Sequence, residues 1–411
     1  MDLPFGDGTL SIDLPDCDVT VATPAGGEPV DPRTAAEAAV ADPHGPPLAS
    51  LADPGDEVAA VVTDVTRATP DDVLLDVLVE ELPVARDQVT VVVGLGLHRP
   101  MTDAELRDGL GDDADLAVNH DPDAAVRVGT VEPPVDGLGP CPVEVHPAVA
   151  DADLVVSTGM VEPHQYAGFS GGAKTVAIGA GSESLIRATH GPAMLAEPGV
   201  RLGRVDDNPF RETVDRAGDL VGPDYCLNVT KAPVGVLGAS AGRPRAVVRD
   251  LAATAREALS VPVDGTYDAV VAGVSPPKDA NLYQASRAAT YVVLGDHNPV
   301  RSGGRVVLPA RLPEGAGEGT GERRFSRRLR AASTPEALYE SMREGYEPGA
   351  QRAFVLARCL READVYVTNS EHPEVVGDCL LIARPTVDDA VEPGSRVLVV
   401  PDALDTLLVR G

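Results

Sequence analysis

The sequence contains no tryptophan, and aromatic residues make up only 3% of its 411 positions. Its core must therefore consist mainly of valine, leucine and alanine, and the 43% of hydrophobic residues is enough for packed interiors. Lysine is almost absent, with three residues against 31 arginines. Together with a net charge of −30, this composition is typical of a halophilic protein, although a generally acidic bacterial proteome gives the same pattern. The negative charge argues against nucleic-acid binding through a broad basic surface.

Cysteines and long apolar runs are also scarce. The five cysteines are scattered and form no C-x-x-C pair, which excludes a disulfide framework or a zinc ribbon and favours a reducing compartment. The first residues contain neither a basic segment nor an apolar one, and no run approaches 18 apolar residues. We therefore expect a soluble, cytoplasmic protein without a membrane or nucleic-acid partner.

Alternating strand and helix patterns predict the fold class as α/β. Strands predicted at 57–63, 88–94 and 152–157 each lead into an unusual loop, and the pattern restarts after residue 262. We predict two α/β domains, residues 1–262 and 263–411, with mostly parallel sheets and an active-site cleft between the domains. Ligands of such sheets bind at the carboxyl ends of the strands. We further predict a linker or an excursion of the chain at 131–142, and a mobile loop at 311–323 that is a candidate lid.

One glycine-rich stretch, residues 157–191, contains the most informative loop. Dense glycine indicates tight turns or a close approach of the backbone to another group. The segment from Gly168 to Thr175 resembles the phosphate-binding motif G-x-x-x-x-G-K-[ST], except that Ala173 replaces a glycine and the loop begins far from the preceding strand. A nucleotide-binding protein remains open as an alternative on these residues.

Three histidines lie at the ends of predicted elements: His98 and His164 follow strands, and His190 ends a helix just before Gly191. His98 and His164 stand beside prolines at the ends of predicted strands, where a lone histidine is more often structural. Two on separate loops of one crevice suit proton transfer at opposite faces of a substrate, as racemisation or epimerisation requires. His190 has no ligand partner at metal-site spacing, and a metal site built from protein alone needs three or four ligands. It is therefore structural unless a cofactor supplies the others.

Two further segments indicate anion recognition. We expect Asp64 to hold the guanidinium of Arg67 and leave its outer edge for a carboxylate or phosphate. Gln284 and Arg287 lie three residues apart on one face of a predicted helix, which alone is equally compatible with an ordinary helix exterior.

Taken together, these segments resemble the nickel-pincer-nucleotide-dependent lactate racemase family over about residues 5 to 400. The resemblance rests on Asp64–Arg67, Gly96–Pro100, Gly159–Lys174, His190 and Asn281–Gln284. It implies two α/β domains with the site between them. It also implies nickel and pyridinium-3-thioamide-5-thiocarboxylic acid mononucleotide, the nickel-pincer nucleotide, as cofactors. The implied roles are attachment of this nucleotide to Lys174, nickel ligation by His190, acid–base catalysis by His98 and His164, cofactor binding by Asp64, Val65, Thr66 and Arg67, and substrate binding by Arg67, Gln284 and Arg287.

The implied activity is that of an isomerase, a racemase or epimerase that inverts the hydroxyl-bearing carbon of a 2-hydroxy acid by hydride transfer to and from the cofactor. Cofactor-synthesis proteins would be partners, and a homo-oligomer is compatible with the sequence. Two departures concern the substrate, because Arg287 replaces the family's lysine and no tryptophan is present. An epimerase of another hydroxy substrate, such as a sugar, is the alternative with the same cofactor.

Overall fold

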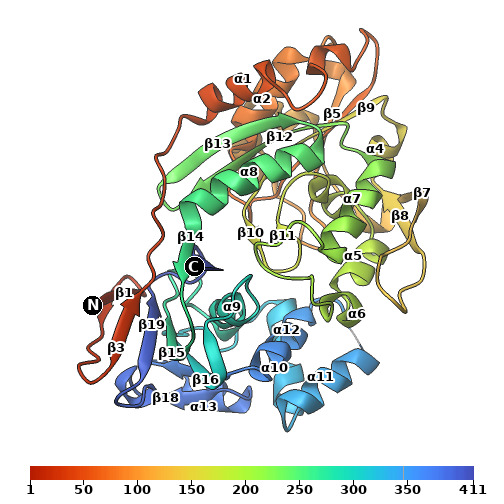
Figure 1. Ribbon diagram of the computed structural model, residues 1–411. Coiled ribbons are helices and arrows are strands. Elements are labelled where there is room, and N and C mark those ends of the chain that lie inside the picture. Colours follow the sequence, from red (N-terminus) through yellow and green to blue (C-terminus); the bar gives the residue numbers. More distant parts are fainter. Residues whose placement is uncertain (346) are drawn as a thin grey trace. The chain divides into compact units, whose positions relative to one another are not determined.

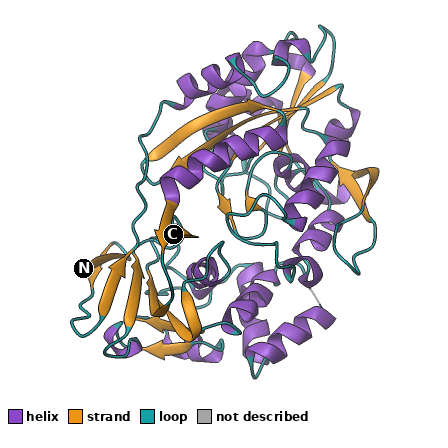
Figure 2. Cartoon of the chain, viewed as in Figure 1, coloured by secondary structure: helices purple, strands orange, loops and turns teal. Residues whose placement is uncertain are grey.

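The computed structural model describes residues 1–345 and 347–411, which form two compact units (Figure 1). The first unit comprises residues 26–200 and 204–258, and the second comprises residues 1–25, 201–203 and 259–411. Each unit is built around one six-stranded sheet, and Figure 2 shows helices packed around these sheets. The predicted α/β class is confirmed.

The sheet of the first unit has the strand order β13-β12-β9-β4-β5-β6, and every pair is parallel except β12 with β13. Its central strands are almost continuous runs of buried apolar residues, as expected when helices cover both faces of a parallel sheet. The strands are β4 (Val58–Val62), β5 (Val89–Val93), β6 (Ala117–Asn119), β9 (Leu154–Met160), β12 (Tyr225–Ala232) and β13 (Gly235–Gly242).

Helices α1, α2 and α3 share one hydrophobic core with these strands. Helix α3 begins with a capping box formed by Thr102 and Glu105. The α-helices of this unit are α1 (Pro32–Ala41), α2 (Asp71–Glu81), α3 (Asp103–Leu110), α4 (Pro147–Asp151), α5 (Glu183–His190), α6 (Pro192–Leu195), α7 (Pro209–Val221) and α8 (Pro244–Leu259).

Two small hairpins complete the first unit. Strand β7 (Val126–Val131) pairs with β8 (Cys141–Val145), and β10 (Pro163–His164) pairs with β11 (Gly168–Phe169). Of the two alternatives predicted for residues 131–142, the structure shows the excursion, because the segment connects the two strands of the β7–β8 hairpin.

The sheet of the second unit is parallel throughout, in the order β18-β17-β16-β15-β19-β3. Two smaller pairs are the antiparallel β1 with β2 and the parallel β14 with β20. The strands are β1 (Asp2–Phe5), β2 (Gly8–Ser11), β3 (Asp18–Val21), β14 (Ser260–Val263), β15 (Tyr267–Ala272), β16 (Val300–Pro309), β17 (Asp364–Thr368), β18 (Ile382–Arg384), β19 (Arg396–Val400) and β20 (Leu407–Arg410). The α-helices are α9 (Leu282–Val293), α10 (Thr320–Ala331), α11 (Pro335–Glu344), α12 (Gln351–Leu360) and α13 (Pro373–Asp378).

The division of the chain differs in one respect from the predicted boundary at 262/263. The chain enters the second unit after Ala258, close to that boundary, but the first 25 residues also group with the second unit. They do so because β3 pairs with β19, almost 380 positions later in the sequence. The predicted mobile loop at 311–323 is partly helical, since α10 begins at Thr320.

The order of strands in the first unit brings three loops to one edge of its sheet. Strand β4 lies between β5, which follows it in the sequence, and β9, which the chain adds later on the other side. The strand order therefore reverses at β4, and α/β proteins bind ligands at the carboxyl ends of the strands next to such a reversal. Among the described residues, no helix combines the length and the apolarity needed to cross a membrane.

Candidate active site

The loop after β4 and the loop after β5 are joined by a carboxylate–imidazole pair. Nδ1 of His98 lies 2.5 Å from Oδ2 of the buried Asp64. The other oxygen of Asp64 accepts hydrogen bonds from the backbone N–H and the hydroxyl of Thr66. Burial raises the pKa of Asp64, but the hydrogen bonds from His98 and Thr66 outweigh it and hold the pKa below its ordinary value. Asp64 is therefore a carboxylate that orients His98, whose side chain is about half exposed.

Arg67 does not pair with Asp64, so that prediction was wrong. The Asp64 oxygens are taken by His98 and Thr66, and Nη1 of Arg67 instead lies 3.3 Å from Oε1 of Glu162, in the loop after β9. Both partners of this ion pair keep about a third of their side-chain surface exposed. Glu162 lies inside the glycine-rich stretch but carried no signal of its own.

The glycines of the loop between β9 and Lys174 allow a path that side chains would block. Gly168 has a φ of +74°, and a Cβ atom there would lie 1.8 Å from the carbonyl oxygen of Arg204. Gly172 has a φ of +60°, and its N–H donates to Oδ1 of Asn228 at 2.8 Å. These positions require glycine for conformational and steric reasons.

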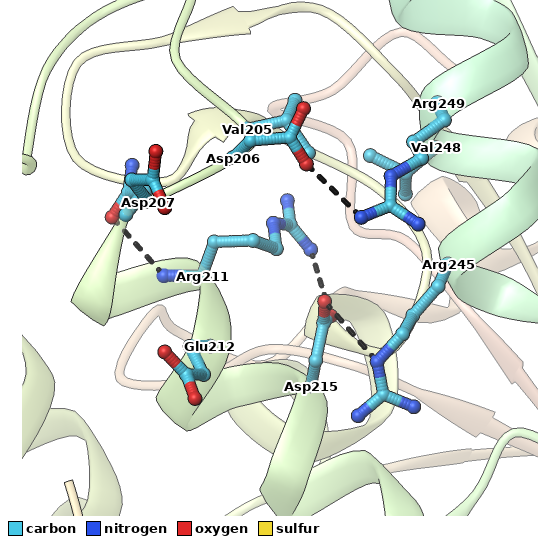
Figure 3. Close-up of a pocket in the computed structure, with 10 residues that line it drawn as sticks. Val205, Asp206, Asp207, Arg211, Glu212, Asp215, Arg245, Val248 and Arg249 are labelled. Atoms are coloured by element: carbon cyan, nitrogen blue, oxygen red, sulfur yellow. Dashed lines mark hydrogen bonds and ion pairs between the residues drawn. The ribbon is translucent and has the colours of Figure 1, made fainter. Parts of the chain in front are cut away.

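A buried arginine of α7 fixes the same loop from the other side. Arg211 is only 2% exposed and donates hydrogen bonds to the carbonyl oxygens of Ala167, Phe169 and Gly171. Its Nη1 also lies 3.4 Å from Asp215 (Figure 3). Nothing in the sequence indicated this role, because Arg211 occupies an ordinary position near the start of an amphipathic helix.

The cavity shown in Figure 3 lies beside Arg211 and has a volume of about 190 Å³. Its arginines are already neutralised, with Arg249 paired to Asp206 at 3.0 Å and Arg245 paired to Asp219 at 2.6 Å. We interpret it as an ion-paired network that supports the loop rather than as an anion site.

Lys174 follows this loop and directly precedes the π-helix Thr175–Gly179. Such turns are rare and occur often at functional sites. Burial, followed by the positive charges of Arg67 and Arg211, lowers the pKa of Lys174 to about 7. A substantial fraction of its amine is therefore neutral near pH 7, and only the neutral form is a nucleophile.

The phosphate-binding interpretation of residues 168–175 loses support in the structure. In that motif the strand leads straight into the loop, and an α-helix follows. Here β9 ends at Met160, the β10–β11 hairpin intervenes, and a π-helix follows Lys174.

The rings of Tyr166 and Phe210 pack against both His164 and His190. The Tyr166 ring centroid lies 5.5 Å from that of His164 and 5.6 Å from that of His190, and Phe210 lies 5.0 Å from His190. Burial first, and then the charge of Lys174, lower the pKa of His190 to about 3 and that of His164 well below its ordinary value. Both histidines are therefore neutral imidazoles at physiological pH, yet each keeps part of its surface exposed.

The end of α5 leaves one nitrogen of His190 available to a metal. Nδ1 lies 3.2 Å from the carbonyl oxygen of Ile186, an acceptor, so Nδ1 carries the proton and the Nε2 lone pair faces away from this bond. Within residues 1–345 and 347–411, no group of three or more His, Cys, Asp or Glu side chains could hold a metal ion. A metal at His190 would thus need ligands from outside the protein.

Gln284 and Arg287 lie on α9 in the second unit. Oε1 of Gln284 is buried and has no hydrogen-bond partner among the described residues, while Arg287 donates to the hydroxyl of Tyr291 at 2.8 Å. An orphaned buried oxygen of this kind is usually explained by an absent ligand or water. Their contact with the same substrate as His98 stays a prediction.

Comparison with known proteins identifies relatives of this chain. Residues 5–203 match the family described as the lactate racemase N-terminal domain. A lactate racemase of Lactiplantibacillus plantarum is 26% identical over 85% of this chain and 84% of its own length. A lactate racemase of Thermoanaerobacterium thermosaccharolyticum is 25% identical over 99% of both chains.

The fold agrees as well. The structure of the lactate racemase apoprotein from T. thermosaccharolyticum superimposes with a TM-score of 0.84 at 24% identity and covers 99% of both chains. A Thermotoga maritima protein gives a TM-score of 0.67 at 16% identity, covering 94% of this chain and 100% of its own. Residues 5–203 thus match a lactate racemase N-terminal domain, and the two relatives that align over most of its length support the lactate racemase family of isomerases for the chain.

Proposed function

We propose that this chain racemises lactate or a closely related 2-hydroxy acid with a nickel-pincer nucleotide attached to Lys174. One observation carries the proposal: Lys174, whose amine is partly neutral, interacts electrostatically with the neutral imidazoles of His164 and His190 and with Asp64, the carboxylate that holds His98. The two relatives that align over most of the chain are both named lactate racemase, which supports the same reaction.

The residues fit such a cofactor. Covalent attachment through an amide-type bond needs a neutral amine, and the lowered pKa of Lys174 provides one. Nickel accepts imidazole nitrogen, and the hydrogen bond at Nδ1 of His190 leaves Nε2 for the metal while fixing the ring. When bound, the group supplies the hydride acceptor and donor for the hydroxyl-bearing carbon.

The chain itself supplies proton transfer and charge. Because the Asp64 carboxylate accepts a hydrogen bond from Nδ1–H of His98, Nε2 carries the lone pair and is the basic nitrogen that takes the hydroxyl proton. Asp64 also stabilises the imidazolium that results. Arg67 is suited to the substrate carboxylate through its guanidinium, part of which remains exposed beside Glu162. Gln284 offers its unpaired oxygen to a hydroxyl group.

The substrate class extends beyond lactate for a physical reason. An arginine at 287 binds a carboxylate through two parallel N–H groups, where a lysine offers a point charge on a longer, more flexible stem. Without tryptophan, the pocket also lacks the largest aromatic wall available to a protein. We therefore propose a range of 2-hydroxy acids, with lactate the first to test.

The test compares the intact mass and nickel content of the wild-type protein with those of Lys174→Ala, after production in a host that makes the cofactor. Lys231→Ala serves as the matched control, because it removes one of the two other lysines, a side chain to which the proposal assigns no role. We expect a mass increment, bound nickel and racemisation of D- and L-lactate in the wild type and the control, and none of them in Lys174→Ala. An unmodified, nickel-free wild-type chain from a host that loads a known lactate racemase would contradict the proposal.

A further inference from the structure

We propose that Glu162 restricts the substrate to 2-hydroxy acids with a single carboxylate, because its negative charge lies on Arg67, the side chain that would receive the substrate. The inference rests on the proposed function, whose range of 2-hydroxy acids it narrows by charge rather than by size.

Glu162 engages only one end of the Arg67 guanidinium. Oε1 of Glu162 lies 3.3 Å from Nη1 of Arg67, and in the described part of the chain neither Nε nor Nη2 of this arginine has a hydrogen-bond partner. The Nε–H and Nη2–H groups are parallel and form an edge that binds a carboxylate through two hydrogen bonds. One substrate carboxylate therefore fits on Arg67 without displacing Glu162.

Backbone hydrogen bonds fix Glu162 at the base of the β10–β11 hairpin. The N–H of Glu162 donates to Oγ of Ser170 at 3.0 Å, and the N–H of Ser170 donates to the carbonyl oxygen of Glu162 at 2.9 Å. Ser170 is itself buried, and its hydroxyl donates to the carbonyl oxygen of Met160 at 2.6 Å. The carboxylate of Glu162 is thus presented to Arg67 from a fixed segment of the chain.

Cofactor attachment would reduce the positive charge around Arg67. Glu162 pairs with this arginine, and Asp64 adds a carboxylate that is hydrogen-bonded to His98. Both carboxylates act on the Lys174 amine, so their electrostatic fields extend through this part of the site. An amide-type bond would remove the charge of that amine, as acylation of a lysine does. The two carboxylates would then face a bound acid without the lysine charge.

A second carboxylate on the substrate would meet the charge of Glu162. In a short acid the two carboxylates lie within about 6 Å of each other, so the second stays in range of Glu162 when the first is bound to Arg67. At the effective dielectric constant of a partly exposed site, one repulsive charge at about this distance weakens binding by about 10- to 100-fold. Arg211, whose charge also reaches this site, is already paired with Asp215 and with backbone carbonyl oxygens. Acids with one carboxylate avoid this repulsion.

The first experiment uses the loaded wild-type enzyme and needs no variant. It compares kcat/KM for lactate, for malate and for malamate, the 4-amide of malate, which matches malate in size but carries a single charge. We expect malamate to be racemised and malate to have a kcat/KM at least about tenfold lower. Equal values for malate and malamate would overturn the inference, because another cation such as Arg287 would then meet the second carboxylate.

The second experiment assigns the discrimination to Glu162. Glu162→Gln keeps an acceptor oxygen for Arg67 but removes the charge, whereas Glu162→Asp keeps the charge and serves as the matched control. We expect the ratio of kcat/KM for malate to that for malamate to rise by about tenfold or more in Glu162→Gln and to stay within about threefold of the wild-type ratio in Glu162→Asp. Because both acids are compared in the same variant, a general loss of activity or stability cancels in the ratio. A wild-type ratio in Glu162→Gln would overturn the inference.

Equilibrium binding separates this inference from the proposed function. Titration calorimetry of the Lys174→Met apoprotein, which lacks the lysine charge as the loaded enzyme would, compares malate with malamate. Binding of malamate that is about tenfold tighter, with the difference lost on adding Glu162→Gln, would support the inference. It would do so even if the wild type racemised no 2-hydroxy acid, a result that would refute the proposed function alone. Equal binding of the two acids, or binding of neither, would overturn the inference, and racemisation of lactate by the wild type would then leave the proposed function intact.

Discussion

Replacing Lys174 by methionine should stabilise the apoprotein, and the gain should disappear as the pH rises. Methionine has nearly the same length as the lysine stem but carries no charge. A pKa of about 7 in place of 10.5 corresponds to about 5 kcal/mol, at about 1.4 kcal/mol per pKa unit. This is the upper limit of the penalty for folding a protonated Lys174. Because the side chain keeps some contact with solvent, we expect about 2–3 kcal/mol.

The pH dependence gives the sign of this effect. In the unfolded chain the amine keeps its ordinary pKa, so between about pH 7 and 10.5 the unfolded state binds more protons than the folded state. The free energy of unfolding of the wild type therefore rises with pH in this window relative to that of Lys174→Met. Below about pH 7 both states are protonated, and the full difference between the two proteins remains.

Urea unfolding of both apoproteins at several pH values between 6 and 10 provides the measurement, with Lys231→Met as the control for the loss of one positive charge. Groups other than Lys174 titrate in both proteins and cancel in the difference. A difference between wild type and Lys174→Met that stays constant over this range would refute the reasoning, since it would show that Lys174 is protonated in the folded state as readily as in the unfolded one.

Three further predictions follow from the geometry. Arg211→Met should lower the free energy of unfolding by about 3–5 kcal/mol and speed hydrogen exchange at residues 167–171, because it leaves buried carbonyl oxygens without a donor and removes one of the two arginines paired with Asp215. Arg245→Met removes a half-exposed ion pair with Asp219 and a contact of 3.7 Å with Asp215, so it should cost less than about 1 kcal/mol, and equal losses in urea unfolding would contradict this account. Asp64→Asn should move the His98 proton from Nδ1 to Nε2, as measured by ¹H–¹⁵N NMR of protein labelled with ¹⁵N-histidine, and should lower kcat by up to about 10⁴-fold. An unchanged His98 spectrum with unchanged kinetics would exclude the orienting role of Asp64. Gly168→Ala should cost about 2 kcal/mol or more in the same unfolding assay, because both φ and the Arg204 carbonyl oppose a Cβ atom, and a neutral effect would show that the turn is not required.

Much of the local structure could be predicted from the sequence, because local patterns determine it. The strands predicted at 57–63 and 88–94 contain β4 and β5, each one residue shorter at both ends. Both are short apolar runs between clear breaks. The helix that ends at His190 was predicted from the glycine that follows. These features depend on neighbours a few residues away.

Features that depend on distant partners were missed. The pairing of β3 with β19 places the first residues in the second unit, and no property of residues 18–21 alone indicates a partner near 396. Arg67 was given the wrong carboxylate for the same reason, because the nearest acid in sequence, Asp64, is held by Thr66 and His98. Glu162 became its partner through the adjacency of β4 and β9.

The electrostatics of the site run against those of the whole chain, and this contrast explains the chemistry best. A protein with a net charge of −30 repels anionic substrates at long range. Yet Arg67, Arg211 and Lys174 lie close enough together for the two guanidinium charges to lower the pKa of the lysine. Under the proposed function, the positive charge of Arg67 would attract a hydroxy acid carboxylate and, together with burial and the charge of Arg211, favours the neutral amine of Lys174. Burial and the charge of Lys174 favour the neutral imidazole of His190. We therefore propose that substrate recognition and cofactor attachment are linked through Arg67.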